Sequence, residues 1–205
     1  MNKPATVSEL GVKKISQFSL GYWVDMPQIG TPPRTYTLTQ EQIDLCDTYA
    51  NSNYNVRSER YADRGENGAY IYDDILVGKQ TELAAAVLLN KPMPSFKVNN
   101  NKAKFEADIG DVGIKGCSLR SVAYVGEPTW VFNHSDINND IRSHDPILHS
   151  HYFITQIDKY TFKLENNTPV PPETIKQNLK PLKNKNPHKR ALYLSSIPKE
   201  YLIDI

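Results

Sequence analysis

Four charged side chains stand at spacings that suit a divalent metal ion beside a phosphate group. Asp108, Asp111 and Lys115 lie within the run ADIGDVGIKG, and Glu82 begins the earlier run ELAAAVLL. Carboxylate oxygens are the ligands that Mg²⁺ prefers, and a lysine beside the metal can position water and stabilise a phosphoryl transition state. These residue types indicate metal-assisted hydrolysis of a phosphodiester bond.

The acidic residue Glu82 falls within a predicted helix. The run KQTELAAAVLL is dominated by strong helix formers, and Asn90 and Pro92 are expected to stop the helix. An alternative role for Glu82 is to complement the helix dipole from the first turn.

The other three charged residues fall on a predicted turn and strand. If residues 111–115 are extended, Asp111, Gly113 and Lys115 share one face, because alternate residues of a strand do so. Asp108 precedes Gly110, where the chain can turn and bring a carboxylate towards the lysine. The alternatives are that the aspartates are ordinary turn formers and that Lys115 is a charge at a sheet edge.

In order and spacing, the Glu82 helix followed by ADIGDVGIKG resembles the core of the PD-(D/E)XK, or restriction-endonuclease-like, nuclease superfamily, in particular its compact phage-encoded members. That core has an ELA-type helix, an aspartate at the start of a strand and a [D/E/Q]-x-[K/R] run on the strand. The resemblance covers residues 79–133, with weaker similarity through FITQIDKYTF. It implies an α/β (or α+β) fold with a mixed central sheet flanked by helices.

The resemblance also implies a role for each residue of the motif. Asp108 matches the metal-binding aspartate, Lys115 the catalytic lysine and Glu82 the helix glutamate of some branches, while the carbonyl of Ile114 stands where a further metal ligand is often supplied. Asp111 competes with Asp108 for the aspartate role. The implied function is a Mg²⁺- or Mn²⁺-dependent DNA nuclease, with RNA left open as a target and a homodimer as a possible assembly.

One position departs from the family pattern. Gly113 stands where the second carboxylate of the motif is expected, and it has no side chain to bind a metal. Either Glu82 or Asp111 substitutes from another direction, or the site is inactive. The alternative function is therefore a non-catalytic module of the same fold that binds nucleic acid or a protein partner.

The length and composition of the chain favour one globular domain. We expect a single domain over residues 1–205, with a core at 70–165, an N-terminal extension at 1–69 and a basic, proline-rich excursion at 166–190. The net charge of +1 means that any nucleic-acid surface is a local patch. The expected phosphate contacts are Arg120, Lys176, Lys180, Lys183, Lys185, Lys189 and Arg190.

Local patterns predict the positions of several elements. Thr39 and Gln42 form a capping box for a helix, a polar loop is expected at 51–68, and helical pattern resumes at Tyr70 with a kink or boundary at Gly78. Strands are expected at 96–98, 105–107, 112–114, 118–124, 130–133, 152–157 and 161–164, with a hairpin near residues 158–159 and a further strand in ALYLSSI.

Other patterns indicate a cytoplasmic protein, located in the host cytoplasm if it is phage-encoded. Cys46 and Cys117 are far apart and form no motif, the N-terminus lacks the apolar core of a signal peptide, and the apolar runs are too short to cross a membrane. His149 and His151 form an HxH pair near His144, which is more typical of two rings on one face of a strand than of a zinc site.

Overall fold

The computed structural model describes residues 34–62, 68–96, 107–133, 137, 147–182 and 189–203. These residues belong to one compact unit, Pro32–Ile205. The expected strands at 96–98 and 105–107 fall mostly outside the described residues, as do the first 33 residues.

The first helix, α1 (Gln40–Ala62), begins at the predicted capping box. The Thr39 hydroxyl accepts from the Gln42 backbone N–H at 3.3 Å, and the Gln42 side chain accepts from the Thr39 N–H at 2.9 Å. The polar loop expected from residue 51 is wrong up to residue 62, because the helix continues. Asn51 and Ser52 stay helical by donating to backbone carbonyls four residues earlier, on an exposed face.

The second helix, α2 (Gly68–Leu88), runs unbroken through Gly78, so the expected helix boundary is wrong. Gly78 is exposed, and the helix is held by the buried run from Leu83 to Ala86. Helix α2 ends near the predicted place, where Asn90 adopts a left-handed conformation with φ 51° before Pro92.

A four-stranded mixed sheet contains three of the predicted strands, those at 112–114, 152–157 and 161–164. Its strands are β1 (Thr35–Thr37), β2 (Gly113–Cys117), β4 (His151–Asp158) and β5 (Thr161–Leu164), in the order β1-β5-β4-β2. Strands β2 and β4 are parallel, whereas β4 and β5 form the predicted antiparallel hairpin. The protein is thus a mixed α/β protein with a mixed sheet, as expected.

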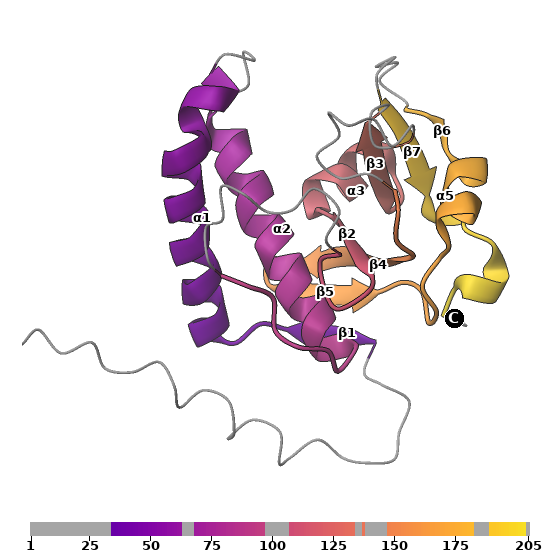
Figure 1. The fold of residues 1–205 in the computed structure, drawn as a ribbon, viewed down its shortest axis with the longest axis horizontal. Helices are drawn as coiled ribbons and strands as arrows, with labels where there is room; N and C mark the ends of the chain where they lie inside the picture. Colours follow the sequence, from indigo (N-terminus) through magenta and orange to yellow (C-terminus); the bar gives the residue numbers. More distant parts are fainter. Residues whose placement is uncertain are drawn as a thin grey trace, which may run out of the picture. The chain divides into compact units, whose positions relative to one another are not determined.

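The two faces of this sheet pack against different partners, as Figure 1 shows. Ile114, Ile154 and Phe162 belong to a core shared with Leu83 and the alanines of α2. On the opposite face, a second core joins this sheet to a three-stranded sheet in the order β3-β7-β6, made of β3 (Thr129–Asn133), β6 (Lys180–Pro181) and β7 (Lys189–Tyr193).

A short helix, α3 (Leu119–Val125), occupies the place where a strand at 118–124 was expected, so that prediction is wrong. The Ser118 hydroxyl caps the helix by accepting from the Ser121 N–H at 3.3 Å. Gly126, with φ 92°, ends the helix in the left-handed region. These caps outweigh the β-branched and aromatic composition between them.

The C-terminal part of the chain is more ordered than a solvated excursion. Helix α5 (Pro172–Asn178) buries Ile175. The predicted ALYLSSI strand is confirmed only in its first three residues, which belong to β7; Leu194–Ser196 form a 3₁₀ turn instead, and a second 3₁₀ turn follows at Lys199–Tyr201. Within the described ranges, no helix is both long and apolar enough to span a membrane.

Candidate functional site

Asp108 precedes the turn between Ile109 and Val112 that leads into β2, and its side chain reaches back to the start of that strand. Its carboxylate accepts a hydrogen bond from the Ile114 backbone N–H at 2.8 Å. The preceding N–H, that of Gly113, donates to Ser150 on the β4 side. Since N–H groups alternate in direction along a strand, the Ile114 N–H points away from β4, and Asp108 covers the outer edge of β2.

Asp111 does not share a strand face with Lys115. Strand β2 begins at Gly113, and Asp111 lies in the tight turn between Ile109 and Val112, in which Gly110 has φ 62°. The Asp111 side chain is 86% exposed, and its carboxylate is 3.8 Å from the Lys91 ammonium. Asp111 is therefore a solvent-exposed residue of a turn.

Glu82 lies at the contact between α1 and α2, paired with Lys79 one turn earlier. The Lys79 side chain is only 7% exposed. Its ammonium also donates to the Ser95 carbonyl at 3.1 Å and lies 4.6 Å from the centroid of the Tyr49 ring. Glu82 therefore neutralises a buried cation, a role that the sequence did not reveal.

The buried thiol beside this ion pair stays protonated. Burial raises the pKa of Cys46 to about 12; the Lys79 charge lowers it and the Glu82 charge raises it, but burial dominates. A neutral thiol is a weak nucleophile, so Cys46 packs as a small apolar residue.

Lys115 lies on the face of β2 that is turned away from α2. A Cβ atom at the next residue, Gly116, would be 2.7 Å from the Thr81 hydroxyl of α2, which shows that Gly116 faces the helix. The Lys115 side chain points the other way, and its ammonium lies 4.9 Å from the centroid of the Phe132 ring of β3. The structure therefore places Glu82 and Lys115 on opposite sides of the four-stranded sheet.

The His151 side chain on the neighbouring strand β4 leaves no space for a side chain at Gly113. A Cβ atom at this position would lie 2.5 Å from Nε2 of His151. The His151 ring is buried, and its Nδ1 lies 2.8 Å from the His149 carbonyl, so Nδ1 carries the proton and donates. The space that a carboxylate side chain needs is filled by imidazole, which the sequence does not reveal because the two residues are far apart in the chain.

Among the predicted phosphate contacts, Arg190 lies on the same side of the β3–β7 pair as Phe132, the residue whose ring Lys115 approaches. Arg190 of β7 is the register partner of Phe132, and opposite residues of an antiparallel pair project to the same side. Because Phe132 and Leu192 both lie in the core between the sheets, Arg190 lies on this side as well. Lys115 and Arg190 thus both lie on the side of the inter-sheet core to which Phe132 projects. Lys115 lies beside the Phe132 ring, and Arg190 is the residue opposite Phe132 in the β3–β7 pair.

The other predicted phosphate contacts are dispersed. Lys180 and Lys189 are exposed on β6 and β7, and Lys176 is half-buried in the last turn of α5. Arg120, on α3, lies 3.3 Å from the Asp74 carboxylate of α2. Lys183 and Lys185 lie outside the described residues.

The described carboxylates do not form the predicted Mg²⁺ or Mn²⁺ site. Glu82 binds Lys79, Asp108 binds a backbone N–H and Asp111 projects into solvent near Lys91. In the part of the chain that the structure describes, no three His, Cys, Asp or Glu side chains gather closely enough to hold a metal ion. The motif is therefore ordered along the chain as predicted, while its carboxylates are separated in space.

Comparisons with known proteins assign no family to this chain. No protein-family model matches it, and searches of the curated proteins and of the solved structures found no match.

Proposed function

We propose that this chain binds nucleic acid and contacts the phosphate backbone with Lys115 and Arg190. The observation that carries the proposal is the placement of both cations on the Phe132 side of the β2 and β7 strands. Both side chains are half-buried beside the core between the two sheets, and lysine and arginine are the usual contacts to the phosphates of a nucleic-acid strand. Lys189, at the adjacent position of β7, adds charge to the same end of the strand.

The order of the elements supports a restriction-endonuclease-like core as part of this proposal. Helix α2 with Glu82 precedes Asp108, which precedes the strand that carries Lys115. This is the order on which the sequence resemblance rests. The pairing of Gly113 with His151 favours the non-catalytic module over the enzyme, because a second carboxylate has no space there.

Fluorescence anisotropy with labelled single- and double-stranded oligonucleotides tests the binding proposal. We expect Lys115→Ala and Arg190→Ala each to weaken binding at low salt and to reduce the slope of log K against log[salt] by about 1. Lys199→Ala, which removes an exposed lysine from the C-terminal turn, is the matched control and is expected to change little. Equal loss in all three variants would show that the effect is only one of net charge.

A second candidate function is metal-dependent phosphodiester hydrolysis. It is favoured by the carboxylate of Asp108, which reaches the backbone of Ile114 immediately before Lys115. The test is incubation of plasmid and single-stranded DNA with Mn²⁺ or with EDTA. Cleavage that needs the metal and disappears in Asp108→Ala and Lys115→Ala supports the enzyme, whereas salt-sensitive binding without cleavage supports the module. If neither occurs, a protein partner becomes the favoured alternative.

A further inference from the structure

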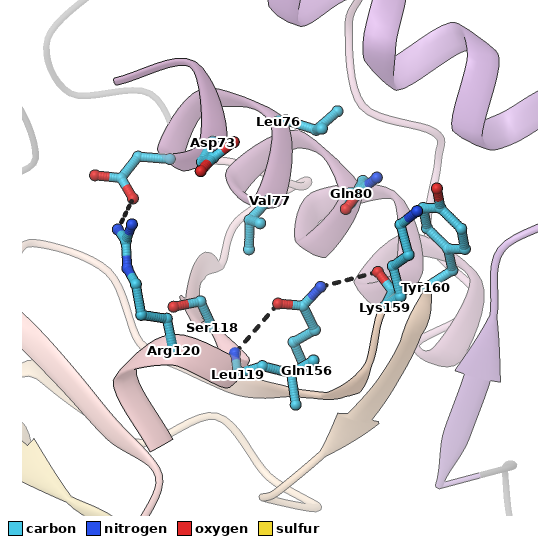
Figure 2. A pocket seen from close by; sticks show the side chains of 11 residues that line it. Asp73, Leu76, Val77, Gln80, Ser118, Leu119, Arg120, Gln156, Lys159 and Tyr160 are labelled. Atoms are coloured by element: carbon cyan, nitrogen blue, oxygen red, sulfur yellow. Dashed lines mark hydrogen bonds and ion pairs between the residues drawn. The ribbon is translucent and has the colours of Figure 1, made fainter. Parts of the chain in front are cut away.

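A pocket of about 320 Å³ lies beyond the carboxyl ends of β2 and β4, the parallel pair of the mixed sheet. Figure 2 shows it between α2, the start of α3 and the turn that joins β4 to β5. In sheets with parallel strands, ligands commonly bind in the crevice at these ends. The pocket is separate from the proposed phosphate contacts, because α2 lines it, whereas Lys115 faces the other side of the sheet.

The pocket is a short groove that runs along α2. Its lining on this helix begins at Asp73 and ends at Gln80. An α-helix rises about 10 Å over such a stretch, which is the length of about three residues of extended chain. The groove therefore matches a short extended peptide segment in length.

The middle of the groove is apolar. Leu76 and Val77 line it from α2 and Leu119 lines it from α3, where Leu119 remains 39% exposed. The Gln156 amide holds this wall in place, because it accepts from the Leu119 N–H at 3.2 Å and donates to the Lys159 carbonyl at 2.9 Å. An apolar side chain that enters here loses its own contact with water and covers that of Leu119.

The two ends of the groove carry opposite charge. Asp73, Asp74 and Arg120 lie at one end, where Arg120 pairs with Asp74 at 3.3 Å, so the net charge of this end is that of one carboxylate. At the other end, the exposed Lys159 places its ammonium 4.9 Å from the centroid of the Tyr160 ring. Figure 2 shows Asp73 and Lys159 at opposite ends. The charges thus complement a ligand that is basic at one end and acidic at the other.

We propose that this groove binds an extended segment of a partner protein in which a basic and an acidic residue flank an apolar one. The basic side chain lies beside Asp73, the apolar side chain beside Leu119, and the acidic side chain beside Lys159. A nucleic-acid strand does not fit this pattern, because its phosphates repeat one sign of charge and would meet Asp73. The inference goes beyond the proposed contact with nucleic acid and does not depend on it.

Titration of the full chain with the capped peptide acetyl-Lys-Leu-Glu-amide, followed by backbone amide chemical shifts, tests the proposal. We expect saturable binding at millimolar concentration, with shifts along α2 from residue 73 to 80, at the start of α3 and in the β4–β5 turn. The neutral peptide acetyl-Gln-Leu-Gln-amide should bind about five- to tenfold more weakly, as the loss of two exposed ion pairs implies. The peptide acetyl-Lys-Gly-Glu-amide, which lacks the apolar side chain, should bind about tenfold more weakly.

Reversal of one charge distinguishes this groove from general electrostatic attraction. Asp73→Lys makes both ends positive, so it should weaken binding of the Lys-Leu-Glu peptide and strengthen binding of acetyl-Glu-Leu-Glu-amide, each by about threefold. Asp44→Lys, at an exposed position of α1, makes the same change in net charge and is the matched control. Leu119→Ser removes the apolar wall at an exposed position and should weaken binding of both peptides.

Three results would overturn the proposal. They are the absence of shifts at millimolar peptide, equal binding of the Lys-Leu-Glu peptide and its neutral counterpart, and equal effects of Asp73→Lys and Asp44→Lys. Each of them leaves the test of Lys115 and Arg190 intact.

Discussion

Charged side chains lie in different environments on the two faces of the four-stranded sheet. On the helical side, Lys79 is buried at the contact between α1 and α2, and Glu82 neutralises it. On the other side, Lys115 lies over the Phe132 ring. The position where the motif expects an acidic residue is Gly113, and the His151 ring fills the space that a side chain would need there. The comparison teaches that an acidic residue and a lysine with suitable spacing in sequence can serve two unrelated environments.

The largest effect is expected when the ion pair of the helical face is broken. Glu82→Ala leaves the Lys79 ammonium buried without this carboxylate, and we expect the free energy of unfolding to fall by about 3 kcal/mol. Urea denaturation measures the change, and Glu173→Ala, at an exposed position, is the control. Replacing both partners together, as Lys79→Met with Glu82→Leu, should recover most of the loss. No difference between the Glu82 and Glu173 variants would contradict a buried role for the pair.

The next effect concerns Gly113 on the opposite face. Gly113→Ala places a methyl group against the His151 ring, and we expect a loss of about 2 kcal/mol in the free energy of unfolding. The clash depends on the imidazole, so the loss from Gly113→Ala should be much smaller in a His151→Ala background, as a double-mutant cycle would show. By the same argument, Gly113→Glu alone should not create a metal-dependent nuclease. Additive effects in the cycle would show that the ring does not restrict position 113.

Burial raises the pKa of a thiol on each side of the sheet, and the larger consequence is expected for Cys46. Burial raises the pKa of Cys46 to about 12; the Lys79 charge lowers it and the Glu82 charge raises it by smaller amounts. Burial also raises the pKa of Cys117, which a hydrogen bond from the Thr129 N–H lowers and the Glu165 charge raises. Above the ordinary value of 9.0, the unfolded chain loses the Cys46 proton while the folded chain keeps it. Stability should therefore fall as the pH rises from 9 towards 12, by about 1.4 kcal/mol per pH unit from Cys46.

Denaturation of the unmodified chain and of Cys46→Ala at pH 7.5, 9.5 and 10.5 measures this contribution. The stability difference between the two proteins should shift in favour of the alanine variant as the pH rises. A difference that stays constant with pH would mean that the Cys46 thiol ionises at similar pH in the folded and unfolded chains.

The smallest effects separate the two aspartates of the motif. Asp108→Ala removes the acceptor of the Ile114 N–H at the edge of β2, and we expect a loss of about 1 kcal/mol. Asp111→Ala should change stability by less than about 0.5 kcal/mol, because its contact with Lys91 is long and exposed. Thermal unfolding in parallel measures both, and the reverse order would place the structural role at Asp111 instead.

Local signals in the sequence were sufficient for the ends of several elements. The capping box of Thr39 and Gln42 predicted the start of α1, and Asn90 with Pro92 predicted the end of α2. The β4–β5 hairpin was likewise predicted from strand patterns on either side of its turn. Each of these features depends on residues within a few positions of one another, so the sequence contains the whole interaction.

Other features depended on tertiary contacts. The composition of residues 118–124 suggested a strand, but Ser118 and Gly126 cap a helix that packs beside β4. The face on which Lys115 lies is set by β2 pairing with β4 in one register, and a shift of one residue would reverse it. The buried pair of Glu82 and Lys79 likewise requires α1 to cover α2.

The sequence by itself determined which residue types follow one another: a helix with Glu82, a turn with Asp108 and Asp111, and a strand with Lys115. Only the tertiary structure decided that the acid of the helix and the lysine of the strand lie on opposite sides of a sheet, and that His151 fills the space beside Gly113. The physical reason is that hydrogen bonds within a helix or a turn are local, whereas sidedness and steric exclusion arise between strands that are distant in the chain.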